Sequence, residues 1–229
     1  IGLAASGTGN IAAFAGVNAG TAPVTATITV TPVFGSCAGS STNFTITVNP
    51  TPSVVDPSDQ VVCNTATTTA VSFSGTATAY NWVNDTPSIG LAGAGTGNIA
   101  AFAATNAGTS PVVATITVTP QTAGPVCVGA SQSFTITVNH TPTVTAVGNQ
   151  TVCNGASTTA INFTGAVGGT SYNWTNDTPS IGLAASGTGN IAAFTGVNGG
   201  AAPVTATITV TPVFGACTGT STNFTITVN

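Results

Sequence analysis

The cysteines are the residues of this chain whose type and spacing most clearly predict chemistry. Cys63 and Cys127 are 64 positions apart, and Cys153 and Cys217 are again 64 positions apart (127 − 63 and 217 − 153). A recurring pair of cysteines predicts a disulfide, and structural disulfides persist in oxidising places outside the cell. The chain is therefore predicted to be extracellular.

The preferred pairing joins Cys63 to Cys127 and Cys153 to Cys217, each bond lying within one repeat. Cys37 is the repeat equivalent of Cys127 and Cys217, so its partner is expected upstream of the first residue, which makes the odd count a result of truncation. A 64-residue loop would restrict the unfolded chain by about 4 kcal/mol. Two alternatives stay open, namely free buried thiols or pairs that span the linkers, Cys37–Cys63 and Cys127–Cys153.

Few other residues could act as acids, bases or metal ligands. Acid–base catalysis needs a positioned His, Asp, Glu, Lys or Tyr, and the single histidine, His140, is interpreted as a linker residue because the preceding joint has Pro50 there. Asp85 and Asp177 lie in NWVNDTP and NWTNDTP. These stretches are interpreted as turns; the alternative is a calcium site, which needs several oxygen ligands. No catalytic residue, metal site or cofactor is predicted, and the chain is not expected to be an enzyme.

Glycines and aromatic residues offer two further possibilities. Two glycine groups superficially suggest a phosphate loop, namely Gly93, Gly95 and Gly97, and Gly187 and Gly189. Strand-like IAAF follows each group and no Gly-Lys-Ser/Thr is present, so turns are predicted. Trp82 and Trp174 each lie two positions after a tyrosine. They are predicted to be core aromatic residues, and the alternative is a platform on which sugar rings stack.

The composition excludes several classes of partner. The 229 residues include no Lys, Arg or Glu and four Asp, so only 2% are charged. Without basic residues the chain cannot neutralise nucleic-acid phosphates or attract anionic lipid headgroups. No apolar run reaches the roughly 18 residues of a membrane span. Neither nucleic-acid binding nor membrane insertion is therefore expected.

Internal repeats predict the domain organisation. IGLA occurs at Ile1, Ile89 and Ile181, and residues 1–49 differ from residues 181–229 at six positions. This period is longer than the 20–50 residues of solenoids and propellers, so it predicts one small domain per repeat. Proline at the joints NPTP and NHTP interrupts sheet pairing. We expect a semi-rigid rod made of the C-terminal half of a β-sandwich repeat at 1–49 and complete β-sandwich repeats at 50–139 and 140–229.

The apolar pattern of one repeat predicts strands. Between Val204 and Thr211, apolar residues alternate with threonines, which indicates half-buried strands. Phe224, Ile226 and Val228 follow the same alternation. About seven such strands per repeat, with a tryptophan on the third and no helical pattern, predict an all-β fold of tandem immunoglobulin-like β-sandwich domains.

The order of the motifs resembles a known family. The motifs are TVNPTP or TVNHTP, NQTVCNGASTTAINFTG, SYNWTNDTPSIGLAASGTGNIAAF, ATITVTP and FTITVN. Together they look like the PKD-like repeats of giant surface proteins of Bacteroidota, and are similar to the gliding adhesins of flavobacteria. The resemblance implies a PKD-like β-sandwich, export by the type IX secretion system, and long cell-surface filaments that bind substrata.

The predicted function is a structural repeat array, a stalk or spacer in a giant extracellular adhesin or cell-surface filament, which gives reach and mechanical stability. The alternatives are a carbohydrate-binding module array of a secreted protein and a multi-chain filament that assembles laterally. The expected partners are neighbouring repeats of the same chain, like chains in a filament, and a surface or glycan ligand at the tip.

Overall fold

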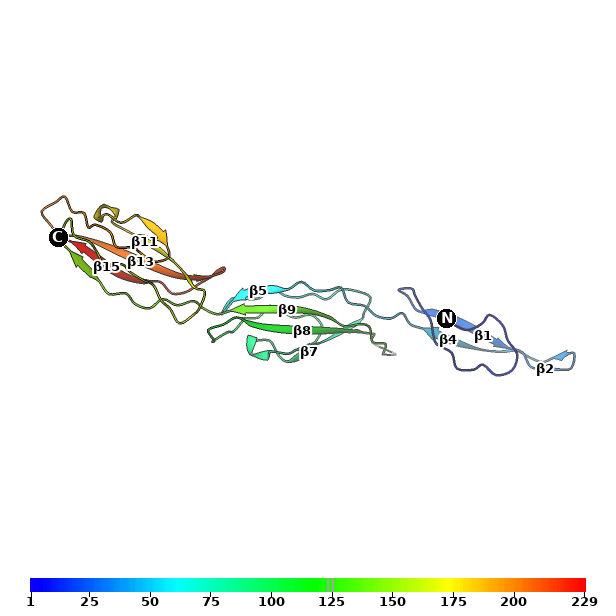
Figure 1. The fold of residues 1–229 in the computed structure, drawn as a ribbon. Coiled ribbons are helices and arrows are strands. Elements are labelled where there is room, and N and C mark those ends of the chain that lie inside the picture. The colour runs from blue at the N-terminus through cyan, green and yellow to red at the C-terminus, as the bar shows by residue number, and fades with distance from the viewer. Residues whose placement is uncertain (123, 125) are drawn as a thin grey trace.

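The computed structural model is an elongated row of three β-rich parts (Figure 1). It describes residues 1–122, 124 and 126–229. We call residues 1–49, 50–139 and 140–229 the N-terminal, middle and C-terminal segments. The middle segment lies between the other two, and the two chain termini lie in the outer parts of the row. The order of the parts in space is therefore their order in the sequence.

The middle segment is built on a five-stranded sheet. Its strand order is β5-β9-β8-β6-β7, in which β5 is parallel to β9 and the other neighbours are antiparallel. A single 3-10 turn, η1, connects β6 to β7. The elements are β5 (Gln60–Cys63), β6 (Ala79–Asn84), η1 (Pro87–Ile89), β7 (Ala94–Thr96), β8 (Val112–Gln121) and β9 (Gln132–Asn139).

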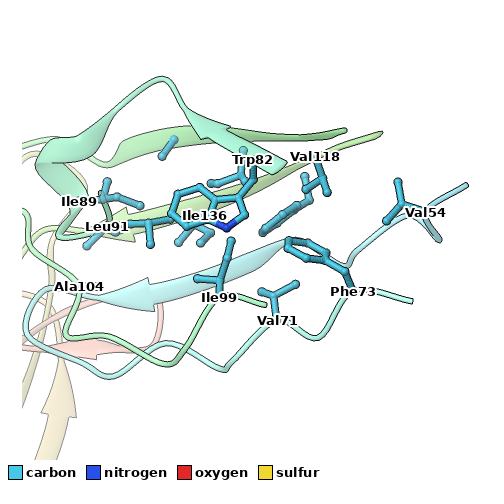
Figure 2. Packing of buried hydrophobic residues seen from close by; sticks show 14 residues of the cluster. Val54, Val71, Phe73, Trp82, Ile89, Leu91, Ile99, Ala104, Val118 and Ile136 are labelled. Atoms are coloured by element: carbon cyan, nitrogen blue, oxygen red, sulfur yellow. The ribbon is translucent and has the colours of Figure 1, made fainter. Parts of the chain in front are cut away.

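A second layer covers this sheet. It is held by isolated bridges between Thr67 and Ala103 and between Val71 and Ile99, so its segments pair antiparallel without forming long strands. Figure 2 shows Trp82 lying between the two layers, with Ile99 and Val71 facing it from the second layer. Alternation along β8 and β9 places Ile116, Val118, Phe134, Ile136 and Val138 in the same core.

The C-terminal segment repeats this architecture. Its sheet has the order β10-β15-β13-β11-β12, with β14 added to the end of β13. Parallel pairing of β10 with β15 matches that of β5 with β9. The elements are β10 (Gln150–Val152), β11 (Ser171–Asn176), η2 (Pro179–Ile181), β12 (Ser186–Thr188), β13 (Val204–Phe214), β14 (Cys217–Thr218) and β15 (Thr222–Val228).

The N-terminal segment contains only part of this arrangement. Its strands β1 (Val24–Val30) and β4 (Thr42–Val48) form a two-stranded antiparallel sheet, and β2 (Val33–Phe34) pairs with β3 (Cys37–Ala38) in a short hairpin. Among the described residues, β4 has no partner on the side where β9 and β15 each carry a parallel strand. The side chains of β4 are mostly exposed.

These features establish the fold class predicted from the sequence. In both longer segments the strand that carries the tryptophan neighbours two antiparallel strands in one sheet, as in immunoglobulin-like sandwiches. The described helical elements are the two short 3-10 turns. No described helix has the length and apolarity needed to cross a membrane. The chain is a tandem array of all-β, immunoglobulin-like domains.

Candidate functional site: the joint between two repeats

A disulfide links the middle and C-terminal segments. Cys63, at the end of β5, is bonded to Cys217, at the start of β14, with their Cα atoms 5.5 Å apart and a sequence separation of 154. The prediction of bonds Cys63–Cys127 and Cys153–Cys217 is therefore wrong in this structure, and the linker-spanning alternative is not formed either. Cys37, Cys127 and Cys153 are free thiols.

Strand register explains why the predicted bond within the middle segment cannot form. Cys63 lies opposite Asn139, at the end of β9 that leads into the joint. Cys127 follows the far end of β8, where Val118 lies opposite Gln132. Seven residues of β9 separate these two ends, which at 3.4 Å per residue is about 24 Å. A disulfide requires Cα atoms roughly 4.4–6.8 Å apart.

The same register brings Cys63 close to the next segment. The chain leaves β9 at Asn139 and enters the C-terminal segment through the linker residues His140 and Thr141. The hairpin of β13 and β14 pairs Phe214 with Cys217, so both side chains lie at the joint. The bond consequently connects the trailing end of one repeat to the leading hairpin of the next.

His140 fills the interior of this joint. Its side chain is 1% exposed, and its ring centroid lies 4.3 Å from that of Phe214 at an interplanar angle of 50°. Neither ring nitrogen has a hydrogen-bond partner among the described residues. The residue lies in the linker, where the sequence placed it, but its burial against Phe214 was not anticipated. We conclude that its contribution to the joint is mainly apolar packing.

One side-chain hydrogen bond also crosses the joint. Asn64 Nδ2 donates to Thr141 Oγ1 at 3.1 Å. Asn64 is held in place because its backbone N–H donates to the Asn139 carbonyl and its Oδ1 accepts from the Asn106 N–H. A disulfide, a buried aromatic contact and a polar contact thus meet within a few residues of the linker.

The side chains of the two turn aspartates accept hydrogen bonds from backbone N–H groups of neighbouring strands. Asp85 Oδ1 accepts hydrogen bonds from the Thr115 N–H and the Thr86 hydroxyl, each at 2.8 Å, and Asp177 does the same with Thr207 and Thr178. These donors, chiefly the backbone N–H groups, lower the pKa of both carboxyl groups below their usual value. Across the described residues, no group of three or more His, Cys, Asp or Glu is placed to hold a metal ion.

The tryptophans lie in the cores of the two longer segments. Trp82 and Trp174 are each 7% exposed, so neither offers a surface on which a sugar ring could stack. An added Cβ at Gly95 would lie 2.2 Å from Trp82 Cζ2, and one at Gly187 would lie 2.3 Å from Trp174 Cζ2. These two glycines belong to short strands and give room for the indoles, which is a role that the sequence-based prediction of turns missed. The turn role holds for Gly97, whose φ is +69°.

The similarity of this chain to known proteins is confined to solved structures. No family model and no curated protein matches the chain. Similar solved structures include the N-terminal Ig1-2 module of the Drosophila receptor protein tyrosine phosphatase DLAR, with 14% identity over 79% of this chain and 100% of that one and a TM-score of 0.28. Mouse cadherin-23 EC22-24 shares 13% identity over 90% of this chain and 74% of that one, with a TM-score of 0.36. At these scores the fold assignment depends on the strand topology described above.

Proposed function

We propose that this chain is part of an extracellular spacer array, a stalk in a giant adhesin or cell-surface filament, in which covalently locked joints keep successive repeats in line. The domain frame of this proposal is one sandwich per repeat, with boundaries at 50–139 and 140–229 and a partial repeat at 1–49. The resemblance to PKD-like repeats of Bacteroidota surface proteins supports export by the type IX system and a cell-surface location.

The observation that carries the proposal is the Cys63–Cys217 bond across the joint. A bond within a domain would stabilise that domain alone, whereas this bond limits the rotation of one domain against the next. His140 and Phe214 remove the space in which the linker could bend. Modules that bind ligands independently of one another do not need restrained joints. A spacer does need them, because its end-to-end length depends on successive repeats staying in line.

Small-angle X-ray scattering of the full chain tests the rod. We expect the oxidised protein to give the profile of one extended conformation, and the Cys63→Ser/Cys217→Ser variant to give a broader distribution of maximum dimensions. The matched control is Cys37→Ser, which should scatter like the unaltered chain. A variant without the bond that is as stiff as the oxidised chain would contradict the proposal.

The carbohydrate-binding alternative is tested separately on a glycan array. Burial of both tryptophans leaves no exposed indole to stack on sugar. We expect the oxidised chain to show no selective glycan binding, and micromolar binding of one glycan class would replace the spacer proposal.

A further inference from the structure

We propose that the outward side of the sheet in the middle segment is a docking surface for the same surface of a second copy of this chain, so that two arrays are joined where they cross. We call this surface the outer face. It consists of the side chains of β5, β6, β7, β8 and β9 that point away from the core. The inference goes beyond the spacer role, which needs no partner.

The outer face belongs to a complete sheet whose two sides have different environments. Along β8 the side chains of Ala114, Ile116 and Val118 are buried, and the residues between them are partly exposed. The second layer lies against the buried side, where Val71 and Ile99 form a bridge (Figure 2). The other side of the sheet is therefore accessible to a partner.

The outer face is less polar than the matching face of the C-terminal segment. Val or Ala occupies five outward positions at which the C-terminal sheet has Thr or Ser. These pairs are Val61/Thr151, Ala79/Ser171, Val83/Thr175, Ala94/Ser186 and Val113/Thr205. The opposite change occurs at Gln121, at the end of β8 away from the disulfide-linked joint. Both sheets have the same strand order and register, so the fold does not require these apolar residues.

Strand register places the three valines on one surface. Val61 and Val113 lie on the two sides of Thr137, and their side chains are 69% and 52% exposed. Val83 is 56% exposed and lies opposite Thr117. Removing these side chains from water on docking is favourable in proportion to the apolar area buried. The valines are therefore the main source of affinity that the outer face offers.

Hydroxyl groups on the outer face are partly satisfied within the sheet. Cross-strand hydrogen bonds join the hydroxyl oxygens of Thr117 and Ser133, at 3.1 Å, and those of Thr119 and Ser131, at 2.8 Å. Burying a hydroxyl group that keeps a hydrogen bond costs much less free energy than burying an unpaired one. These pairs therefore lower the cost of dehydrating the outer face.

Charged side chains lie only at the edges of the outer face. Its five strands contain no Asp, Glu, His, Lys or Arg. Asp59 Oδ1 accepts a hydrogen bond from the Thr135 N–H, and Asp85 Oδ1 accepts one from the Thr115 N–H. Thr135 and Thr115 lie opposite each other on β9 and β8, so the two carboxylates lie at opposite edges. Two outer faces consequently meet without burying a charge at their centre.

The size of the outer face fits a weak dimer. Five strands spaced about 4.8 Å apart, with an average of about six residues at 3.4 Å each, cover roughly 500 Å². Two copies would thus bury about 1,000 Å² in total, which is the lower limit for a specific interface. Because both partners use the same surface, the pair has two-fold symmetry.

The direction of the strands determines how two arrays meet. Strands β8 and β9 run along the row of segments (Figure 1). Sheets that pack face to face keep their strands within about 30° of each other, at an angle set by their twist. Two docked arrays therefore cross at such an angle, and the contact is confined to about one repeat of each.

Sedimentation velocity of the oxidised full chain tests the docking, with the free thiols alkylated so that no disulfide forms between molecules. We expect a reversible dimer with a Kd of roughly 10–500 μM, weak because the buried area is small. Val61→Thr/Val83→Thr/Val113→Thr should weaken it at least about tenfold, because hydroxyls replace three methyl groups on each face. This variant should fold normally, since the C-terminal sheet has threonine at all three positions. A chain that stays monomeric up to about 1 mM, or a variant that dimerises equally well, would overturn the proposal.

Two lysine variants locate the contact. Val113→Lys and Ser72→Lys each add one positive charge at an exposed position, but Ser72 lies on the second layer, between the buried residues Val71 and Phe73. Val113→Lys puts like charges on both partners of the pair, so the dimer should no longer be detectable. Ser72→Lys should dimerise like the unaltered chain. Equal loss of the dimer in both variants would contradict docking through the outer face.

Ionic strength gives a second readout. Asp59 and Asp85 repel their counterparts on the partner, and salt screens this repulsion, so added salt should strengthen the dimer. A dimer that salt weakens would mean that charge attraction holds it, which this inference excludes.

A glycan is the other candidate occupant of the outer face. Glycan binding that the unaltered chain shows and the triple threonine variant loses, without dimerisation, would assign the face to a glycan and overturn the proposal. These results are distinguishable from failure of the spacer proposal, because the scattering experiment measures the stiffness of single molecules at concentrations below dimerisation.

Discussion

Two regions of this molecule have nearly the same sequence and very different environments. Residues 1–49 and 181–229 differ at six positions. Yet Phe44 is 45% exposed and its equivalent, Phe224, is 2% exposed. Ser6–Thr8 form no strand, whereas the identical residues 186–188 form β12 against β11. The difference is the layer that residues 140–180 supply to residues 181–229. The shared sequence therefore adopts its buried state only when the other half of the sandwich covers it.

The largest expected difference between the two regions concerns their cysteines. Cys217→Ser should lower the free energy of unfolding by up to about 5 kcal/mol, the loop-closure value for a 154-residue loop. Cys37→Ser removes an exposed free thiol and should change it by less than about 0.5 kcal/mol. Urea unfolding followed by circular dichroism measures both. The reduced, unsubstituted chain is the control, and it should match Cys217→Ser.

A second comparison concerns the equivalent phenylalanines. Phe224→Ala should cost about 3–5 kcal/mol because it empties a filled core, while Phe44→Ala should cost about 1 kcal/mol or less because water already reaches that ring. The same urea experiment applies. Equal losses of stability would mean that Phe44 is buried in solution, and the two regions would then not differ in their environments.

The equivalent glycines should differ by a smaller amount. Gly187→Ala places a methyl group 2.3 Å from Trp174 Cζ2 and should cost about 1–3 kcal/mol, with a change in tryptophan fluorescence. Gly7→Ala has no atom within 4 Å of the added carbon, so stability and fluorescence should stay as they are. A fluorescence change in the Gly7 variant would show that a tryptophan lies near the N-terminal segment.

The smallest expected difference is in acid. The folded-state pKa of Asp177 lies below its usual value because the Thr207 N–H and Thr178 hydroxyl stabilise the carboxylate. Its contribution is therefore complete above about pH 5 and is lost as the pH falls through the unfolded and then the folded pKa. The N-terminal segment has no Asp or Glu. Amide exchange at Thr207 should accelerate in acid beyond the ordinary pH dependence, and Asp177→Asn should remove that excess, while exchange at Thr27 shows none.

The sequence predicted the fold class because the pattern that encodes it is local. Alternation along Val204–Val210 and Phe224–Val228 specifies which side chains face inward, and the structure buries all of them except Val204, which is half-buried. The burial of Trp82 and Trp174 could be predicted because each lies two positions after a tyrosine on a strand. Repeat spacing likewise showed which cysteines are equivalent to one another.

The pairing of the cysteines could not be predicted in the same way. The spacing of 64 compares positions along the chain, whereas the bond depends on which end of a sheet each position occupies. That required the parallel register of β5 on β9, a contact between residues 76 positions apart. Phe214 and His140 could not be paired for the same reason, since their contact exists only once two domains are placed end to end. Gly95 and Gly187 resembled turn glycines because nothing local indicates an indole above them.

The bond across the joint has a consequence for a chain under tension. Pulling the two ends of the oxidised protein apart sends the force from Cys63 to Cys217 through their sulfur atoms. The 154 residue steps between the two cysteines carry no load. If this part of the chain were fully extended, it would add about 500 Å to the length of the protein, at roughly 3.3 Å per step. Stretching would therefore be limited by a covalent shortcut, and a reducing agent would release the hidden length.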